Sequence, residues 1–165
     1  MLVQALILLF LGLVIFAALH DIASFKIPNW VCLAIIGLFP LYGFAAGLDL
    51  AAWGGHLLGG MLGLMLGMAL FATGGLGGGD GKLFAAACLW FGWNDFLSFL
   101  FLTMLAGGVL AVVLLMIRRS LAENIALGGL LTHRAFGSGE PVPYGVAIAA
   151  GAMWCLPFAA ILPAA

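Results

Sequence analysis

The sequence predicts an all-α, polytopic membrane protein with about six transmembrane helices. Hydrophobic residues make up 66% of the 165 residues and charged residues only 7%, which is too little charge for the surface of a soluble domain. The mean hydropathy is +1.31, so the lipid bilayer is the expected solvent. A spanning helix takes roughly 17–25 apolar residues, and the chain therefore fits one membrane domain over residues 1–165.

Apolar runs separated by polar or glycine-rich breaks give the expected helices. They cover residues 2–20, 30–47, 52–73, 78–93, 96–117 and 143–162. The first run has no basic residue before it and is longer than the apolar core of a signal peptide, so we interpret it as a permanent span. The third run carries a ladder of glycines that lets another helix approach closely, namely Gly55, Gly59, Gly63 and Gly67.

The charges are distributed unevenly between the two ends of these helices. With six helices, all five basic residues fall on one side: Lys26, Lys82, Arg118, Arg119 and Arg134. The opposite loops carry Asp49 and Asp95. The positive-inside rule then predicts that the basic loops are cytoplasmic and that both termini lie outside. The connection 118–142 is interpreted either as an amphipathic interfacial element or as a solvated loop.

Composition also excludes several classes of function. A chain with a net charge of −1 has no overall electrostatic attraction to nucleic acid, so no nucleic-acid partner is expected. The three cysteines, Cys32, Cys88 and Cys155, are widely separated within apolar runs. This spacing fits neither a disulfide framework nor a zinc site. No metal ion and no organic cofactor are expected.

Two aspartates on the basic side are the candidates for chemistry. Asp21 closes the first expected helix and Asp80 opens the fourth, so both lie at the same membrane depth. Facing carboxylates cannot both ionise cheaply, and one is held protonated while the other stays charged. Such a pair can hydrolyse a peptide bond, because the charged group takes a proton from water and the neutral one donates a proton. Structural roles at helix ends explain the same two residues from composition alone.

The surroundings of the two aspartates add detail. Asp80 lies in the run Gly77-Gly78-Gly79-Asp80-Gly81-Lys82, where glycines allow close approach of another backbone. The run lacks the glycine and the serine or threonine of a phosphate-binding loop. After Asp21, Pro28 ends an extended segment and Asn29 is expected to cap the second helix.

Three motifs resemble those of the prepilin peptidase family. The first is Asp21 followed by Lys26 and Ile27-Pro28-Asn29, and the second is the GxGD motif Gly77-Gly78-Gly79-Asp80 followed by Lys82. The third is Pro143-Tyr144-Gly145 at the start of the last helix. The motifs occur in order over nearly the whole chain.

The resemblance implies an aspartic endopeptidase whose catalytic residues are Asp21 and Asp80. Its substrate would be a prepilin or pseudopilin, from which it removes a short basic leader at the cytoplasmic boundary of the bacterial inner membrane, usually after a glycine. The chain is most similar to the short peptidases of Tad (Flp) pilus assembly, so no N-methyltransferase domain is expected. Support of the aspartates or of the substrate is expected from Lys26, Gly77, Gly79, Lys82, Pro143 and Gly145.

Other roles are compatible with part of this pattern. Lys26 and Lys82 are equally explained as anchors that extend toward the membrane surface. Paired carboxylates within a membrane also serve proton relays in small transporters, although such proteins commonly contain an internal repeat that is not evident around Asp21 and Asp80. A non-catalytic pilus-assembly subunit is a further alternative, and it would tolerate substitution of both aspartates.

Overall fold

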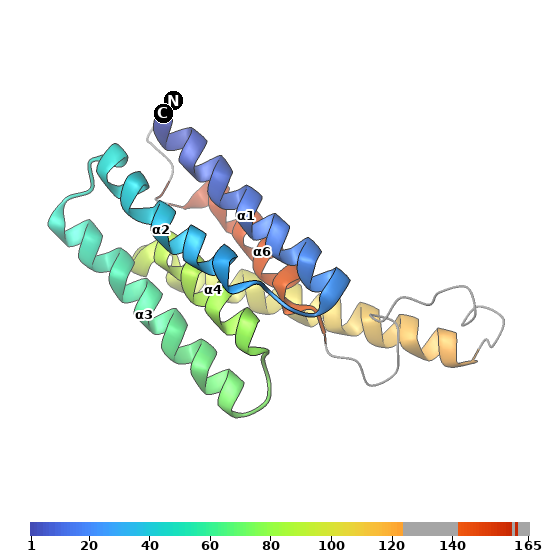
Figure 1. The fold of residues 1–165 in the computed structure, drawn as a ribbon. Helices are drawn as coiled ribbons and strands as arrows, with labels where there is room; N and C mark the ends of the chain where they lie inside the picture. The colour runs from blue at the N-terminus through green and yellow to red at the C-terminus, as the bar shows by residue number, and fades with distance from the viewer. Residues whose placement is uncertain (124–141, 160, 162–165) are drawn as a thin grey trace.

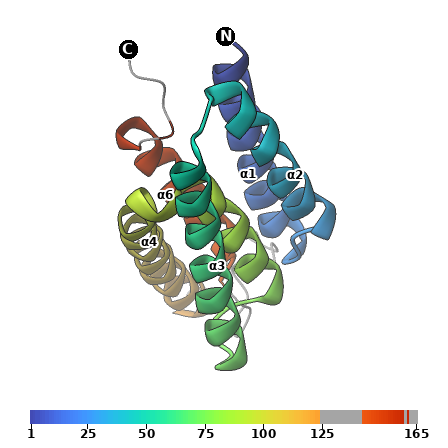
Figure 2. The same cartoon turned by 90° about the vertical axis from the view of Figure 1, so that its left-hand side faces the viewer.

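The structure, a computed structural model, describes residues 1–123, 142–159 and 161. Its elements are α1 (Leu2–Ser24), α2 (Asn29–Ala46), α3 (Leu50–Ala72), α4 (Gly78–Glu123), α6 (Tyr144–Cys155) and a short 3-10 helix, η2 (Leu156–Phe158). The helices form one bundle, in which the start of α1 and the end of α6 lie toward the same end (Figures 1 and 2). Most of the connection 118–142, with Arg134, lies outside the described residues.

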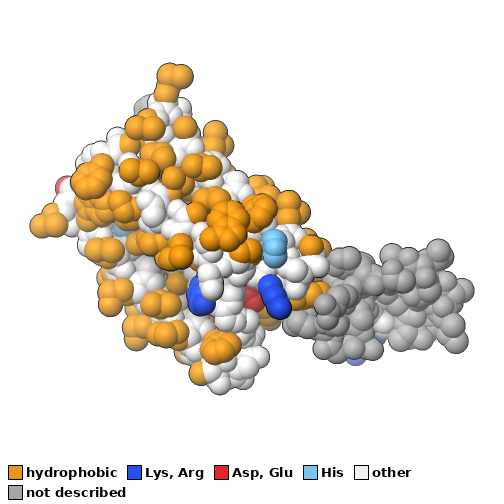
Figure 3. Space-filling model, in the orientation of Figure 1, with side chains coloured by type: hydrophobic (Ala, Val, Ile, Leu, Met, Phe, Trp, Pro, Cys, Tyr) orange, Lys and Arg blue, Asp and Glu red, His pale blue; other side chains and the backbone are white. Residues whose placement is uncertain are grey.

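The all-α membrane architecture is confirmed. Among the described residues, four helices are long and apolar enough to cross a membrane, and a shorter apolar helix covers Tyr144–Phe158. Large apolar side chains are exposed over much of the surface (Figure 3), as expected for a protein whose solvent is lipid. The last helix is shorter than the predicted 143–162, because α-helical structure ends at Cys155 and Pro157 follows, which disfavours continuation of the helix.

The element α4 is two helices that meet at a sharp reversal. Gly92 has φ 65° and ψ −172°, which is not helical. The rings of Phe84 and Phe99 stack with their centroids 5.5 Å apart, whereas 15 residues of continuous helix would separate them by about 22 Å. The two parts, residues 78–91 and 93–123, therefore run back along each other, as Figures 1 and 2 show. This matches the separate helices predicted over 78–93 and 96–117.

His56 of α3 stabilises the break. Its Nδ1 donates a hydrogen bond to the carbonyl oxygen of Leu89, at 2.9 Å. The reversal at Gly92 removes the helical N–H groups that the last carbonyls of the preceding helix would otherwise bind. His56, which is isolated in the sequence, therefore has a structural partner in the bundle.

The predicted glycine ladder packs α3 against the first part of α4. A Cβ atom at Gly59 would lie 2.7 Å from the Gly92 carbonyl carbon, and one at Gly67 would lie 2.9 Å from the Gly81 carbonyl oxygen. Backbone is thus in close contact with backbone at Gly59 and Gly67, whereas the nearest atom at Gly55 is Cβ of Trp93, at 4.0 Å. This packing fixes the position of Gly81, and with it the position of the neighbouring Asp80.

We expect Gly63→Leu to destabilise the bundle. A Cβ atom there would lie 2.7 Å from both Cβ and Sγ of Cys88, and overpacking of a core typically costs about 1–3 kcal/mol. Gly54→Leu in the same helix is the matched control, because nothing lies within 4 Å of its added Cβ. Thermal unfolding of both purified variants in detergent measures the difference. Equal melting temperatures would contradict the close packing of these helices.

Candidate active site

Asp21 lies in the last turn of α1 and is 4% exposed. The helix ends at Phe25, which adopts left-handed backbone angles, φ 51° and ψ 32°, and donates its N–H to the Asp21 carbonyl oxygen at 2.8 Å. A non-glycine residue rarely takes this conformation. The chain therefore reverses directly beyond Asp21, and the segment 25–28 leads into α2.

The reversal after Asp21 is held by His20 and Ser24. His20 Nδ1 donates to the carbonyl oxygen of Lys26 at 2.7 Å. Ser24 Oγ donates to the carbonyl oxygen of His20 at 2.8 Å. The sequence analysis did not predict this role for either side chain. The one feature of the sequence that could have indicated it is the histidine directly before the candidate aspartate.

Asp80 lies in the first turn of α4 and is 8% exposed. Two glycines that precede Asp80 make close contacts. A Cβ atom at Gly77 would lie 2.6 Å from Asp80 Oδ2, and one at Gly79 would lie 3.2 Å from Cβ of Ile27. The absence of a side chain at Gly77 therefore leaves room for the Asp80 carboxylate. The absence of one at Gly79 lets the start of α4 pack against Ile27, in the segment that follows Asp21.

The N-terminus of α6 connects the two aspartates. The Gly145 N–H donates to Asp21 Oδ2 at 2.9 Å, and the Gly145 backbone also interacts with the Asp80 carboxylate. N–H groups in the first turn of a helix have no partner within the helix and carry a partial positive charge. Gly145 also has no side chain to obstruct the approach, since a Cβ atom there would lie 3.0 Å from Asp21 Oδ2.

Both carboxylates line one cavity of about 370 Å³, together with Phe25, Leu76 and Tyr144. They are close enough to interact electrostatically, although 59 residues separate them in the sequence. Asp80 Oδ1 is buried and has no hydrogen-bond partner among the described residues. An unsatisfied buried oxygen is costly, and here it belongs to a group that could bind a water or a substrate carbonyl.

Two further residues that the sequence predicted for the site, Pro143 and Lys26, lie outside the lining of the cavity. Pro143 is buried and precedes the first residue of α6, so it helps to place Gly145. The Lys26 side chain is exposed. Within the described part of the chain the Lys26 ammonium forms no hydrogen bond or ion pair, and only its backbone carbonyl is engaged.

The expectation that Asn29 caps α2 is corrected, and Lys82, whose supporting role stays a prediction, has Asn29 as its hydrogen-bond partner. Asn29 is the first residue of α2 rather than its cap, and Pro28 occupies the cap position without a side-chain hydrogen bond. Asn29 Oδ1 instead accepts from Lys82 Nζ at 3.0 Å. Because Lys82 points to Asn29, it contacts neither aspartate among the described residues, and it joins the start of α2 to the start of α4.

The site has the features of a carboxylate pair rather than of a metal centre. Within residues 1–123, 142–159 and 161, no three His, Cys, Asp or Glu side chains gather in a way that could hold a metal ion. Two buried carboxyl groups beside a helix N-terminus can hold one proton between them and bind a water molecule. This arrangement is suited to general acid–base chemistry.

Comparison with known proteins identifies the family. No curated protein and no solved structure matches the chain. The family model of the type IV leader peptidases matches residues 8–112, which is more than half of the chain and includes both Asp21 and Asp80. The match implies that the protein is a peptidase and therefore a hydrolase. The chain belongs to the type IV leader peptidase family.

Proposed function

We propose that this protein is an aspartic endopeptidase that removes the basic leader from Flp-type prepilins or pseudopilins. The observation that carries the proposal is the meeting of Asp21 and Asp80 at one cavity beside the N-terminus of α6. The family match supports a peptidase. It favours this function over a proton relay, which would use the same two carboxylates without a peptide substrate.

In the proposed reaction, one aspartate is ionised and the other is protonated. The ionised carboxylate takes a proton as the water oxygen bonds to the scissile carbonyl carbon, and the protonated carboxyl donates its proton to the carbonyl oxygen. The tetrahedral intermediate then breaks its C–N bond. The leaving amine takes the proton from the first carboxyl, and the hydroxyl of the intermediate returns a proton to the second.

Gly145 has a defined role in this scheme. Its N–H donates to Asp21 Oδ2 at 2.9 Å, and a hydrogen bond to a carboxylate favours the charged form. We therefore assign Asp21 as the ionised partner that activates water. Asp80, whose Oδ1 has no described partner, is assigned as the protonated partner that faces the carbonyl.

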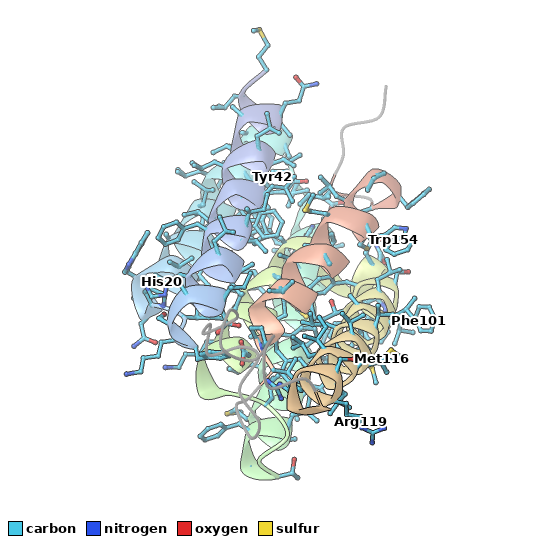
Figure 4. All side chains as sticks on the ribbon, turned by 90° about the vertical axis from the view of Figure 1, so that its right-hand side faces the viewer. His20, Tyr42, Phe101, Met116, Arg119 and Trp154 are labelled. Carbon is cyan, nitrogen blue, oxygen red and sulfur yellow. The ribbon has the colours of Figure 1, made fainter. Side chains whose placement is uncertain are left out.

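The proposed orientation places the aspartates on the cytoplasmic side of the bacterial inner membrane. Lys26 and Lys82 lie within five residues of Asp21 and Asp80 respectively. Figure 4 shows Arg119 near the end of the bundle opposite the N-terminus, whereas Tyr42 and Trp154 lie nearer to the N-terminal end. The positive-inside rule places such a basic end in the cytoplasm, where the leader of a prepilin would meet it.

Co-expression with Flp-type prepilins in a host without its own leader peptidase tests the proposal. We expect the prepilins to lose their leader, which is seen as a shift on a gel. Mass spectrometry should then show that the new N-terminus directly follows a glycine of the precursor. A membrane-inserted wild-type protein that leaves a panel of such prepilins uncut would overturn the proposed function.

A further inference from the structure

A second cavity adjoins the one that contains the aspartates. It has a volume of about 250 Å³ and lies between α3, the second part of α4 and α6. Leu76 and Tyr144 line both cavities, so the two are adjacent at these residues. Phe84 and Ile148 are buried in the second cavity, while Leu70 and Met104 are exposed along it. The second cavity is therefore an apolar groove that opens on the lipid-facing surface.

Two adjacent glycines of α4 shape this groove. A Cβ atom at Gly107 would lie 3.4 Å from the Tyr144 ring and 3.5 Å from Cβ of Ala147, so this glycine faces α6. A Cβ atom at Gly108 would have nothing within 4 Å, and Gly108 lines the groove. The first glycine thus serves the packing of α6, whereas the second leaves open space along the groove.

The substrate of the proposed reaction requires a place for its apolar segment. Cleavage at the cytoplasmic membrane boundary leaves the leader in water, and the chain on the other side of the scissile bond enters hydrocarbon. Backbone at that depth must satisfy its own hydrogen bonds, so this segment is helical. Helices of this kind bind apolar grooves through side chains at i, i+3 and i+4, and a few such side chains match a volume of about 250 Å³.

We infer that the groove between α3, the second part of α4 and α6 binds the apolar helix that follows the scissile bond of the substrate. The inference rests on the proposed function. The two cavities adjoin, which defines the inferred path: the scissile bond lies between Asp21 and Asp80, the chain passes Leu76 and Tyr144, and its first helical turns pack on the open face at Gly108. The groove then acts as a specificity site, because it selects substrates by the shape of one helix face.

A larger groove elsewhere does not meet the same requirement. It has a volume of about 510 Å³ and lies between α2, α3 and the first part of α4. Its lining has no residue in common with the cavity of the aspartates. At its polar end, Lys82 and Asn29 are hydrogen-bonded to each other. This larger groove between α2, α3 and the first part of α4 therefore provides the comparison site for the experiment.

The first test fills the groove without disturbing the bundle. In Gly108→Leu the added Cβ has no neighbour within 4 Å, and the side chain beyond it extends into the space assigned to the substrate. We expect prepilin cleavage to slow by at least about tenfold, the effect of a lost apolar contact in a specificity pocket, mainly through a higher KM. Gly12→Leu in α1 is the matched control, because nothing lies within 4 Å of its Cβ either.

The second test maps the substrate directly by photocrosslinking. Met104 in the groove and Met61 in the comparison groove are 67% and 64% exposed. Each is replaced in turn by a photoreactive phenylalanine derivative, and full-length prepilin is added to the Asp80→Asn background. We expect crosslinks to the apolar segment of the prepilin from position 104 and none from position 61.

The outcomes separate this inference from the proposed function. If the wild type cleaves prepilins but Gly108→Leu cleaves as fast as Gly12→Leu, the groove assignment is wrong and the peptidase stands. Crosslinks from position 61 alone would also overturn the groove. If the wild type cleaves no prepilin, both the function and the inference fall.

Discussion

Asp21→Asn and Asp80→Asn should each abolish prepilin cleavage while the helical bundle still forms in the membrane. An amide can neither take up the proton of water nor donate a proton as a carboxyl does, so each variant lacks one of the two steps. Loss of a general acid or base, together with the disturbed pairing of its partner, is expected to lower the rate by at least about 10³-fold. Cleavage of co-expressed prepilin, followed over time on a gel, measures the effect.

The matched control for these variants is Asp49→Asn. Asp49 is the N-cap of α3, and its Oδ1 accepts from the Ala52 N–H at 2.7 Å. It lies on the loop between α2 and α3, on the side opposite the proposed chemistry, and asparagine caps a helix about as well as aspartate. Asp49→Asn should therefore cleave at the wild-type rate. Normal cleavage by either Asp21→Asn or Asp80→Asn would refute the assignment of the pair.

Gly77→Ala should reduce cleavage by about 100-fold, with little change in the stability of the bundle. The added Cβ would lie 2.6 Å from Asp80 Oδ2, so the carboxylate must rotate or shift. A displacement of about 1 Å at a reacting group is enough for a rate loss of this size. The stability changes little because Asp80 Oδ2 is the end of a side chain rather than part of the backbone.

The adjacent glycine of the same motif provides the contrast. At Gly78 the nearest atom to an added Cβ is Cε2 of Phe71, at 3.4 Å, which is ordinary contact with an exposed ring. Gly78→Ala should therefore retain cleavage within a few-fold of the wild type. Initial rates for the two variants, at matched amounts of protein in the membrane, give the comparison. Equal rates would mean that the position of the Asp80 carboxylate does not limit the reaction.

Much of the fold could be predicted because its determinants are local. Each spanning run is long and apolar by itself, and the breaks around Gly47, Gly74 and Gly92 each contain a glycine with positive φ. The glycine ladder of α3 repeats at the spacing of one helix face, so its packing role could also be predicted. Errors were confined to helix ends: Asn29 pairs with Lys82 of another helix instead of capping α2, and Pro157 ends the last helix earlier than its apolar composition indicated.

The candidate site was only partly predictable. The two aspartates stood out because charge is rare in an apolar chain, and the motifs around them resemble a known family. The roles of His20 and Ser24 could not be predicted, because they depend on the left-handed turn at Phe25. The partner of Lys82 was also missed, since Asn29 is 53 residues away in the sequence.

By itself, the sequence determined that this chain forms apolar helices, and it predicted that the basic residues gather on one side and that Asp21 and Asp80 lie at one depth. These properties follow from composition and from the order of the runs. The tertiary structure alone decided that the N–H of Gly145 reaches a carboxylate 124 residues earlier, and that an apolar groove adjoins the cavity of the aspartates. Both depend on how closely non-adjacent helices approach, and that distance is set by the side chains of two surfaces together rather than by the periodicity of either one.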